Sequence, residues 1–264
     1  MRNETKDKII GHLSDVMERL ITRRCDTEPF NEELILTHNP FGARLIPMEV
    51  WKGSKFERSF VTTLGQGIFE VIGKYIAEGS GAYAENQHLT NLHVCTWRIE
   101  RIDTLLSNQR SGSSAPTPNW TQEVSEMLTL SNDRFIDVPI ISDLYVIRPG
   151  GIEEFCSFKT VKPNLDQTEK AKRDMLRLLA GDNNYQPFFA LPYNPAGDGE
   201  TYKRCGFTFP YKLFDMDNDE CVLVGSKLWN KLGDEENAYE DLLNLFDEVG
   251  RKYIPIIKTR YLNI

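Results

Sequence analysis

Two charged residues interrupt apolar, strand-forming stretches and are the first candidates for chemistry in this chain. Asp143 lies among Ile, Leu, Tyr and Val in RFIDVPIISDLYVIR, and Lys159 lies among Phe, Cys and Val in EFCSFKTV. A lone carboxylate or ammonium group is costly to bury, so each of these side chains needs an opposite charge or a bound cation beside it. An acid and a base on neighbouring strands therefore indicate either a structural ion pair or an active site.

These two stretches predict a β-hairpin. Val, Ile, Phe and Tyr dominate residues 134–148 and 154–161, and the Pro-Gly-Gly between them breaks the run. Side chains alternate between the two faces of a strand. One face of the first strand would carry Ile141, Asp143, Tyr145 and Ile147, and one face of the second would carry Glu153, Phe155, Ser157 and Lys159.

The surrounding elements predict an α/β fold. Apolar residues at helical spacing predict helices over residues 3–24, 55–78 and 165–180, and a further strand is predicted at about 187–192. The order helix, hairpin, helix, strand describes a mixed central sheet flanked by helices. A strand turning into a helix at 220–229 and an amphipathic helix at 236–250 add elements at the C-terminal end, as the first helix does at the N-terminal end.

Three segments give weaker signals. Residues 25–53 hold Pro, Asn and Gly and predict mostly irregular structure, whereas residues 91–106 fit a helix or a strand equally well. SNQRSGSSAPTPNW, residues 107–120, predicts a loop because Ser, Gly and Pro oppose regular structure. We expect either a mobile surface loop or a DNA-contacting loop in which Arg110 is the only charge.

Charge and composition narrow the function classes. The net charge of −8 weighs against a nonspecific nucleic-acid binder, yet six basic residues gather between Lys159 and Arg177, which suits a local basic cleft. Five cysteines without CxxC spacing weigh against a zinc site or a disulfide framework. No apolar run approaches the roughly 18 residues of a membrane span, and the charged N-terminus lacks a signal core. These features predict a cytoplasmic protein with no membrane partner.

Asp143 followed by SFKT at 157–160 resembles the signature of the PD-(D/E)XK nucleases. In that superfamily an Asp opens the hairpin, and an acid-x-Lys triplet follows on the next strand; here sixteen residues separate Asp143 from Lys159. The blocks 59–79, 142–164 and 224–250 together resemble type II restriction endonucleases of the TdeIII/MjaII-like family. The resemblance implies a single restriction-endonuclease-like domain over 1–264. Its nuclease core would span about 55–195, and elements 200–264 would pack on it or form a DNA-recognition or dimer lobe.

One position departs from the signature: Ser157 stands where the superfamily usually has Asp or Glu. Its hydroxyl supplies no charge, so the second carboxylate would come from elsewhere. Glu70 is the first candidate, because it shares a helix row with Thr63 and Gln66 and the superfamily often supplies a helical Glu. Glu153, on the strand face of Lys159, is the second, and Glu57 is the third. A solvated helix face is the alternative for Glu70.

The resemblance also implies roles for these residues. Asp143 with Glu70 or Glu153 would hold Mg²⁺, a hard cation that prefers oxygen ligands. Lys159 would orient or deprotonate the attacking water, and Ser157 would contribute through its hydroxyl. A plain ion pair between Asp143 and Lys159 is the alternative. Residues in and before the helix at 165–180 would contact DNA, unless they form an ordinary charged surface: Lys162, Asn164, Gln167, Lys170, Arg173 and Arg177.

The predicted function is that of a type II restriction endonuclease, which hydrolyses double-stranded DNA at a short palindromic sequence with Mg²⁺. Cutting both strands of a palindrome predicts a twofold homodimer, and a cognate DNA methyltransferase would protect the host site. Two alternatives stay open. One is a repair or junction nuclease on the same core, and the other is a noncatalytic DNA-binding or dimerisation module, which the loss of the acid at Ser157 would suit.

Overall fold

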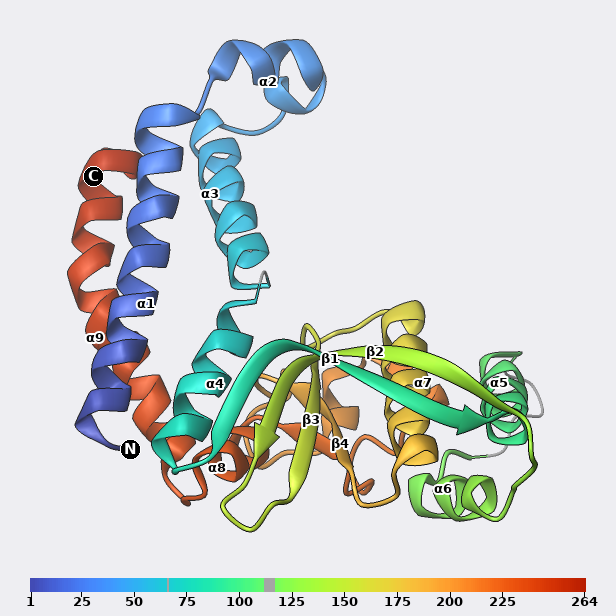
Figure 1. The fold of residues 1–264 in the computed structure, drawn as a ribbon. Coiled ribbons are helices and arrows are strands. Elements are labelled where there is room, and N and C mark those ends of the chain that lie inside the picture. The colour runs from blue at the N-terminus through green and yellow to red at the C-terminus, as the bar shows by residue number, and fades with distance from the viewer. Residues whose placement is uncertain (66, 112–116) are drawn as a thin grey trace. The chain divides into compact units, whose positions relative to one another are not determined.

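The computed structural model of the chain describes residues 1–65, 67–111 and 117–264 (Figure 1). It divides into two compact units, one formed by residues 1–68 with 240–264 and the other by residues 69–239. In the described part of the chain, no helix is long and apolar enough to cross a membrane.

The larger unit is built on a five-stranded mixed sheet. Its strands are β1 (Tyr83–Cys95), β2 (Phe135–Ile147), β3 (Glu153–Phe158), β4 (Gln186–Leu191) and β5 (Val222–Val224), and they lie in the order β1-β2-β3-β4-β5. The pairs β1–β2 and β2–β3 are antiparallel, whereas β3–β4 and β4–β5 are parallel. The predicted hairpin and the predicted mixed sheet are confirmed. Between β2 and β3 the chain turns at Gly151, whose φ of +79° favours glycine.

Helices cover both faces of this sheet: α4 (Ile68–Gly79), α5 (Thr96–Ser111), α6 (Trp120–Leu128), α7 (Leu165–Gly181) and α8 (Ser226–Gly233). Leu144 of β2, Phe158 of β3 and Leu232 of α8 surround Gly73 of α4, which places α4 and α8 on one face. Helices α5 and α7 pack on the opposite face (Figure 1). The predicted helix 165–180 is confirmed; a Cβ at Gly181 would lie 2.8 Å from the Leu92 side chain, so this close approach requires glycine.

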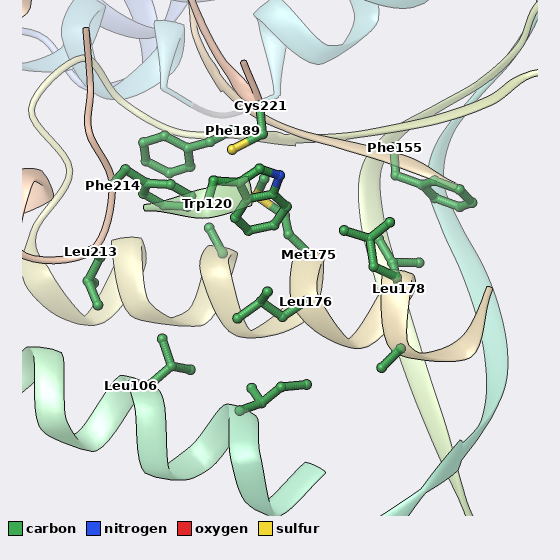
Figure 2. Packing of buried hydrophobic residues seen from close by; sticks show 14 of the residues in the cluster. Leu106, Trp120, Phe155, Met175, Leu176, Leu178, Phe189, Leu213, Phe214 and Cys221 are labelled. Atoms are coloured by element: carbon green, nitrogen blue, oxygen red, sulfur yellow. The ribbon is translucent and has the colours of Figure 1, made fainter. Parts of the chain in front are cut away.

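The main core lies between the sheet and helices α5, α6 and α7. Figure 2 shows Met175 and Leu176 of α7 lying between the layer that holds Phe189 and Phe214 and Leu106 of α5. The rings of Phe189 and Phe214 stack with centroids 4.8 Å apart. Helix α7 is therefore packed against the sheet beside β2, which carries Asp143, and β3, which ends just before Lys159.

The smaller unit is helical. It contains α1 (Asn3–Thr22), α2 (Glu32–His38), α3 (Met48–Leu64), most of α9 (Ala238–Ile256) and two π-helical turns, Arg23–Thr27 and Ile257–Leu262. Helix α1 buries the apolar stripe predicted for it, including Ile9, Leu13 and Val16. The Tyr253 hydroxyl donates a 2.7 Å hydrogen bond to Glu18 and thereby joins α9 to α1. Helices thus occupy both ends of the chain, as predicted.

Two predictions of helix extent are wrong. The expected helix 55–78 is two helices, α3 and α4, because Gly65 caps α3 and Gly67 has a φ of +78° that no helix continues. Gln66 lies outside the described residues. The region 25–53 is also more regular than expected: Asn31 caps α2 through its side chain, and α3 begins at Met48 directly after Pro47.

The two remaining weak segments resolve into known elements. Residues 91–106 are both strand and helix, because β1 ends at Cys95 and α5 begins at Thr96. The loop predicted at 107–120 is wrong at both ends, since α5 continues to Ser111 and α6 begins at Trp120, and residues 112–116 lie outside the described part. Tertiary contact overrides the polar composition here, because the fully buried Gln109 donates to Glu123 of α6.

Candidate active site

Asp143 and Lys159 meet across β2 and β3. The Lys159 Nζ lies 3.0 Å from the Asp143 Oδ2, and the same ammonium group donates to the Ser157 Oγ at 2.9 Å and to the Phe158 carbonyl at 2.7 Å. The register explains the contact: Leu144 pairs with Cys156, so the antiparallel ladder puts Asp143 level with Ser157. Strand β3 ends one residue before Lys159, although the Lys159 N–H still donates to Ala190 of β4.

This ion pair is open to solvent on one side. The Lys159 side chain is 18% exposed and the Asp143 side chain 22%, so both charges keep access to water. Asp143, Ser157 and Lys159 line a pocket of about 40 Å³ whose other wall is α7. A single water needs roughly 10–15 Å³, so the pocket has room for small polar species next to both charges.

Glu70 of α4 approaches the same place. Burial, and next the charge of Asp143, raise the pKa of the Glu70 carboxyl above its ordinary value, while Gln87 and Lys159 act in the opposite direction. The Gln87 Nε2 donates to the Glu70 Oε2 at 3.0 Å. The structure therefore brings the first-choice acid, Glu70, close enough to Asp143 for the two carboxylates to repel each other.

Asn86, next to Gln87 in β1, links the backbones of the two acids. Its Nδ2 donates to the carbonyl of Glu70 at 2.9 Å and to the carbonyl of Asp143 at 3.2 Å. Sequence reasoning missed both amides, because residues 83–90 had not been identified as a strand. The sequence signal that could have indicated them was an adjacent Asn and Gln just before LTNLHVC, a stretch that fits a strand.

Asp174 of α7 is a further acid that sequence reasoning missed. It lines the pocket with Asp143, Ser157 and Lys159, and it forms a 2.6 Å ion pair with Lys170. The signal was its place four residues after Lys170, on the helix stripe that follows Lys159. On a charged helix such an acid resembles any solvated surface residue, so the sequence alone did not distinguish it.

Glu153, the second candidate for the missing acid, lies away from Asp143. Glu153 pairs with Ile147 at the turn of the hairpin, four residues along β3 from Ser157, and its carboxylate accepts a hydrogen bond from the Tyr145 hydroxyl. The structure therefore does not bring Glu153 to Asp143. Glu57 lies in α3, within the smaller unit.

Two of the predicted DNA-binding residues serve α7 itself. The Asn164 side chain accepts from the Gln167 N–H at 2.8 Å, and the Gln167 side chain accepts from the Asn164 N–H at 3.1 Å. This reciprocal capping box satisfies donors at the start of the helix. Asn164 and Gln167 thus fix where α7 begins, shortly after the segment that carries Ser157 and Lys159.

The four basic candidates differ in their surroundings. Arg173 pairs with Asp103 of α5 and with Glu169, and Arg177 is partly buried on the same helix. Lys170 is exposed and lines the pocket, and Lys162 is exposed in the turn before α7. Arg110, the charge of the predicted loop, pairs at 2.7 Å with Asp166 and at 2.6 Å with Glu169. Lys162 and Lys170 are therefore exposed, whereas Arg173 and Arg110 join α7 to α5 through their ion pairs.

The donor set suits a hard divalent cation. Among the described residues, no group of three or more His, Cys, Asp or Glu side chains is placed to hold a metal ion. Mg²⁺ in proteins is commonly bound by only one or two carboxylates and keeps several waters or substrate oxygens. Burial, and next the charge of Asp143, raise the pKa of Glu70, and a cation beside the two carboxylates would oppose the second of these effects.

Comparisons with known proteins identify the family. The family model described as type II restriction endonuclease HinfI matches residues 5–250. The type II restriction enzyme HgiCII of Herpetosiphon aurantiacus is 30% identical over 218 residues, covering 80% of this chain and 77% of that protein. The type II restriction enzyme HgiBI of the same organism is 29% identical over 260 residues, covering 94% of this chain and 93% of its own. This chain therefore belongs to the HinfI family of type II restriction endonucleases.

Proposed function

We propose that this type II restriction endonuclease cleaves double-stranded DNA through a PD-(D/E)XK-type site formed by Asp143, Ser157, Lys159 and Glu70. The observation that carries the proposal is the 3.0 Å contact of Lys159 with Asp143 across β2 and β3, beside a pocket open to solvent. A kinship with the TdeIII/MjaII-like family stays a prediction, since the matched family is HinfI.

Lys159 is the group that would act on the attacking water. Its ammonium group is held by the Ser157 hydroxyl and the Phe158 carbonyl as well as by Asp143, so its position is fixed before substrate binds. A fixed cation beside the scissile phosphate can orient a water and stabilise the negative charge that develops on the phosphate oxygens. Ser157 then serves to orient Lys159, a role for which a neutral hydroxyl is sufficient.

Asp143 and Glu70 would hold Mg²⁺. When bound, the ion lowers the pKa of a water and neutralises charge on the phosphate. Asp143, which contacts Lys159, would supply one carboxylate. Glu70 of α4 would supply the second, in place of the acid that the signature has at the position of Ser157. Asp174, which lines the same pocket, is the competing source of the second carboxylate. Glu153, hydrogen-bonded to Tyr145, is left out of the proposed ion site.

Lys162 and Lys170 are the proposed phosphate contacts, because both are exposed and both follow Lys159 closely in the chain. Arg173 would contact DNA only by releasing Asp103 and Glu169, and Arg177 is partly buried, so we propose neither of them as a phosphate contact. Three further points stay predictions: a twofold homodimer recognises a short palindrome, a cognate methyltransferase protects the host site, and the protein is cytoplasmic. Specific base contacts would contribute about 1–3 kcal/mol each.

A plasmid of known sequence tests this proposal. We expect wild-type protein with Mg²⁺ to cut it at discrete sites, and chelation or Asp143→Asn to abolish cutting. Mapping the ends gives the recognition sequence, the overhang and the presence or absence of a palindrome. Glu153→Gln, outside the proposed site, is the matched acid-to-amide control and is expected to cut normally. Retention of DNA without cleavage would instead support a noncatalytic module, and sequence-independent cutting would support a repair-type nuclease.

A further inference from the structure

Strand β1 contains a backbone irregularity level with the active-site aspartate. Gln87 has a φ of +54°, a left-handed conformation that is uncommon for residues with a Cβ atom. The ladder keeps its register on both sides, since Asn86 pairs with Leu144 and His88 pairs with Ser142. Gln87 therefore stands opposite Asp143, at the one position between these pairs.

Near this position, the side chains of β2 also stop alternating strictly between the two faces of the sheet. Ile140 belongs to the buried cluster under α7, and so does Tyr145. Strict alternation puts residues an odd number apart on opposite faces of a strand. Leu144, between them, instead packs near Gly73 of α4. The interruption of alternation thus falls between Ile140 and Leu144, the interval of β2 that contains Asp143 and lies beside Gln87 of β1.

The side chain of Gln87 uses this position to hold Glu70. Its Nε2 donates to the Glu70 Oε2 at 3.0 Å, while the neighbouring Asn86 ties the carbonyls of Glu70 and Asp143 together. An amide donor fixes one carboxylate oxygen without cancelling its charge, unlike a lysine or an arginine. The remaining lone pairs of Glu70 stay available to a cation.

We propose that Gln87 is a positioning residue, whose left-handed backbone and amide group hold the Glu70 carboxylate toward Asp143 for a divalent cation. This inference rests on the proposed function, because it gives Gln87 a purpose only if Glu70 and Asp143 hold a cation together. It explains why an unfavourable backbone conformation occurs within a regular ladder. Strained residues in folded proteins concentrate where function requires a fixed geometry.

Two substitutions separate the backbone of Gln87 from its side chain. Gln87→Asn keeps an amide and a residue type that tolerates positive φ, but its amide stops one methylene short of Glu70. Gln87→Gly removes the side chain and relieves the backbone. Asn91→Ala, at an exposed position of the same strand, is the matched control.

Mn²⁺ binding, followed by the electron paramagnetic resonance signal of the free ion, gives a readout that does not depend on turnover. We expect both Gln87 variants to bind Mn²⁺ more weakly by a factor of about 10 or more, the scale seen when groups that orient metal ligands are removed. The midpoint of thermal unfolding should be unchanged or higher for Gln87→Gly. Cleavage should recover in both variants as Mg²⁺ is raised.

The inference would be overturned if both Gln87 variants bound Mn²⁺ as tightly as wild type. It would also be overturned if wild-type protein bound no detectable Mn²⁺, or if Glu70→Gln left Mn²⁺ binding unchanged. Failure of the proposed function has a different appearance. In that case Asp143→Asn and Lys159→Ala would cut plasmid DNA like wild type, whatever the Gln87 variants do. Normal cutting by wild type, loss in Asp143→Asn and no effect at Gln87 would reject the positioning role alone.

Discussion

The molecule contains two lysine–acid pairs of the same chemical type in very different surroundings. Lys172 of α7 and Glu123 of α6 form one, with side chains 0% and 7% exposed; Lys159 and Asp143 form the other, with 18% and 22% exposed. The Lys172 Nζ also contacts the Gln109 side chain at 3.1 Å and the Leu213 carbonyl, so its donors are used internally. One pair is sealed in the core, and the other opens onto a pocket.

This difference shows how one pairing can serve structure or chemistry. Burial lowers the pKa of Lys172, and the charge of Glu123 opposes that shift, so the pair persists only because each ion compensates the other. Asp143 instead has a second carboxylate nearby, Glu70, whose pKa is raised by burial and by Asp143 itself. An excess of negative charge next to a solvent-open lysine leaves the second site suited to a cation and a phosphate.

Of the two lysines in this comparison, Lys159 should have the larger effect on activity when it is removed, with little effect on stability. We expect Lys159→Ala to lower the rate of DNA cleavage about 10²–10⁴-fold, the range for loss of a positioned proton-transfer group. Since the lysine is partly solvated, the midpoint of urea unfolding should move little. Cleavage assays at fixed Mg²⁺ and equilibrium unfolding measure the two quantities. Cutting at the wild-type rate would remove Lys159 from the mechanism.

Removing Lys172 should have the opposite profile. Lys172→Met leaves Glu123 buried without a countercharge, which costs about 3–5 kcal/mol in the free energy of unfolding. The double variant Lys172→Met, Glu123→Gln removes both charges and should recover a substantial part of that loss. Urea denaturation measures all three proteins. A single variant as stable as wild type would mean that Glu123 is solvated or protonated, and the comparison of the two pairs would fail.

The sequence predicted the pair of Asp143 and Lys159 but not the pair of Lys172 and Glu123, and the difference has a physical reason. A charge within a strand of Ile, Tyr and Phe stands out against period-two alternation, so Asp143 and Lys159 were recognisable. Lys172 lies in a helix that carries many charges, and only tertiary packing turns it inward. Asp174 escaped notice for the same reason, since nothing in a charged helix marks the side that faces a pocket.

Predictions that required distant contacts were the weaker ones. Apolar spacing runs on through Gly65 and Gly67, so it gave one helix where the backbone makes two. Glu70 was chosen through family resemblance, whereas Gln87 became visible only through its φ and its bond to Glu70. A left-handed residue with a Cβ atom has no sequence signature within a strand, because the tertiary structure alone imposes it. The single-domain boundary 1–264 stays a prediction.

Glu70 and Asp174 compete as the second carboxylate, and a matched pair of variants decides between them. If Glu70 holds the cation, Glu70→Gln should raise the Mg²⁺ concentration for half-maximal cleavage by roughly 10-fold or more, on the scale seen for disturbed metal sites. Asp174→Asn should then change it little, because Asp174 already pairs with Lys170. The reverse order of effects would assign the cation to the α7 side of the pocket.

The smallest expected effect concerns the stability of the metal-free protein as pH changes. Burial, and next Asp143, raise the pKa of Glu70, so the folded chain binds a proton there more tightly than the unfolded chain. The stabilisation that this proton gives the folded chain is fully present below the pKa of Glu70 in the unfolded chain. It is lost as the pH rises through the higher pKa that Glu70 has in the folded chain. Glu70→Gln, which keeps no charge, should therefore be more thermally stable than wild type at neutral pH in chelator, and this advantage should shrink as the solution is acidified.

Adding Mg²⁺ supplies the control for this effect. A cation that binds the folded state stabilises it by mass action, so Mg²⁺ at pH 7 should raise the unfolding midpoint of wild-type protein more than that of Glu70→Gln. Lys172→Met, whose defect lies in the sealed pair, should respond to the ion as wild type does, because its carboxylates at the open pair are intact. If Glu70→Gln unfolds at the same midpoint as wild type at every pH, the Glu70 carboxylate is fully solvated. The pair of Lys159 and Asp143 would then lack the neighbouring negative charge that distinguishes it from the pair of Lys172 and Glu123.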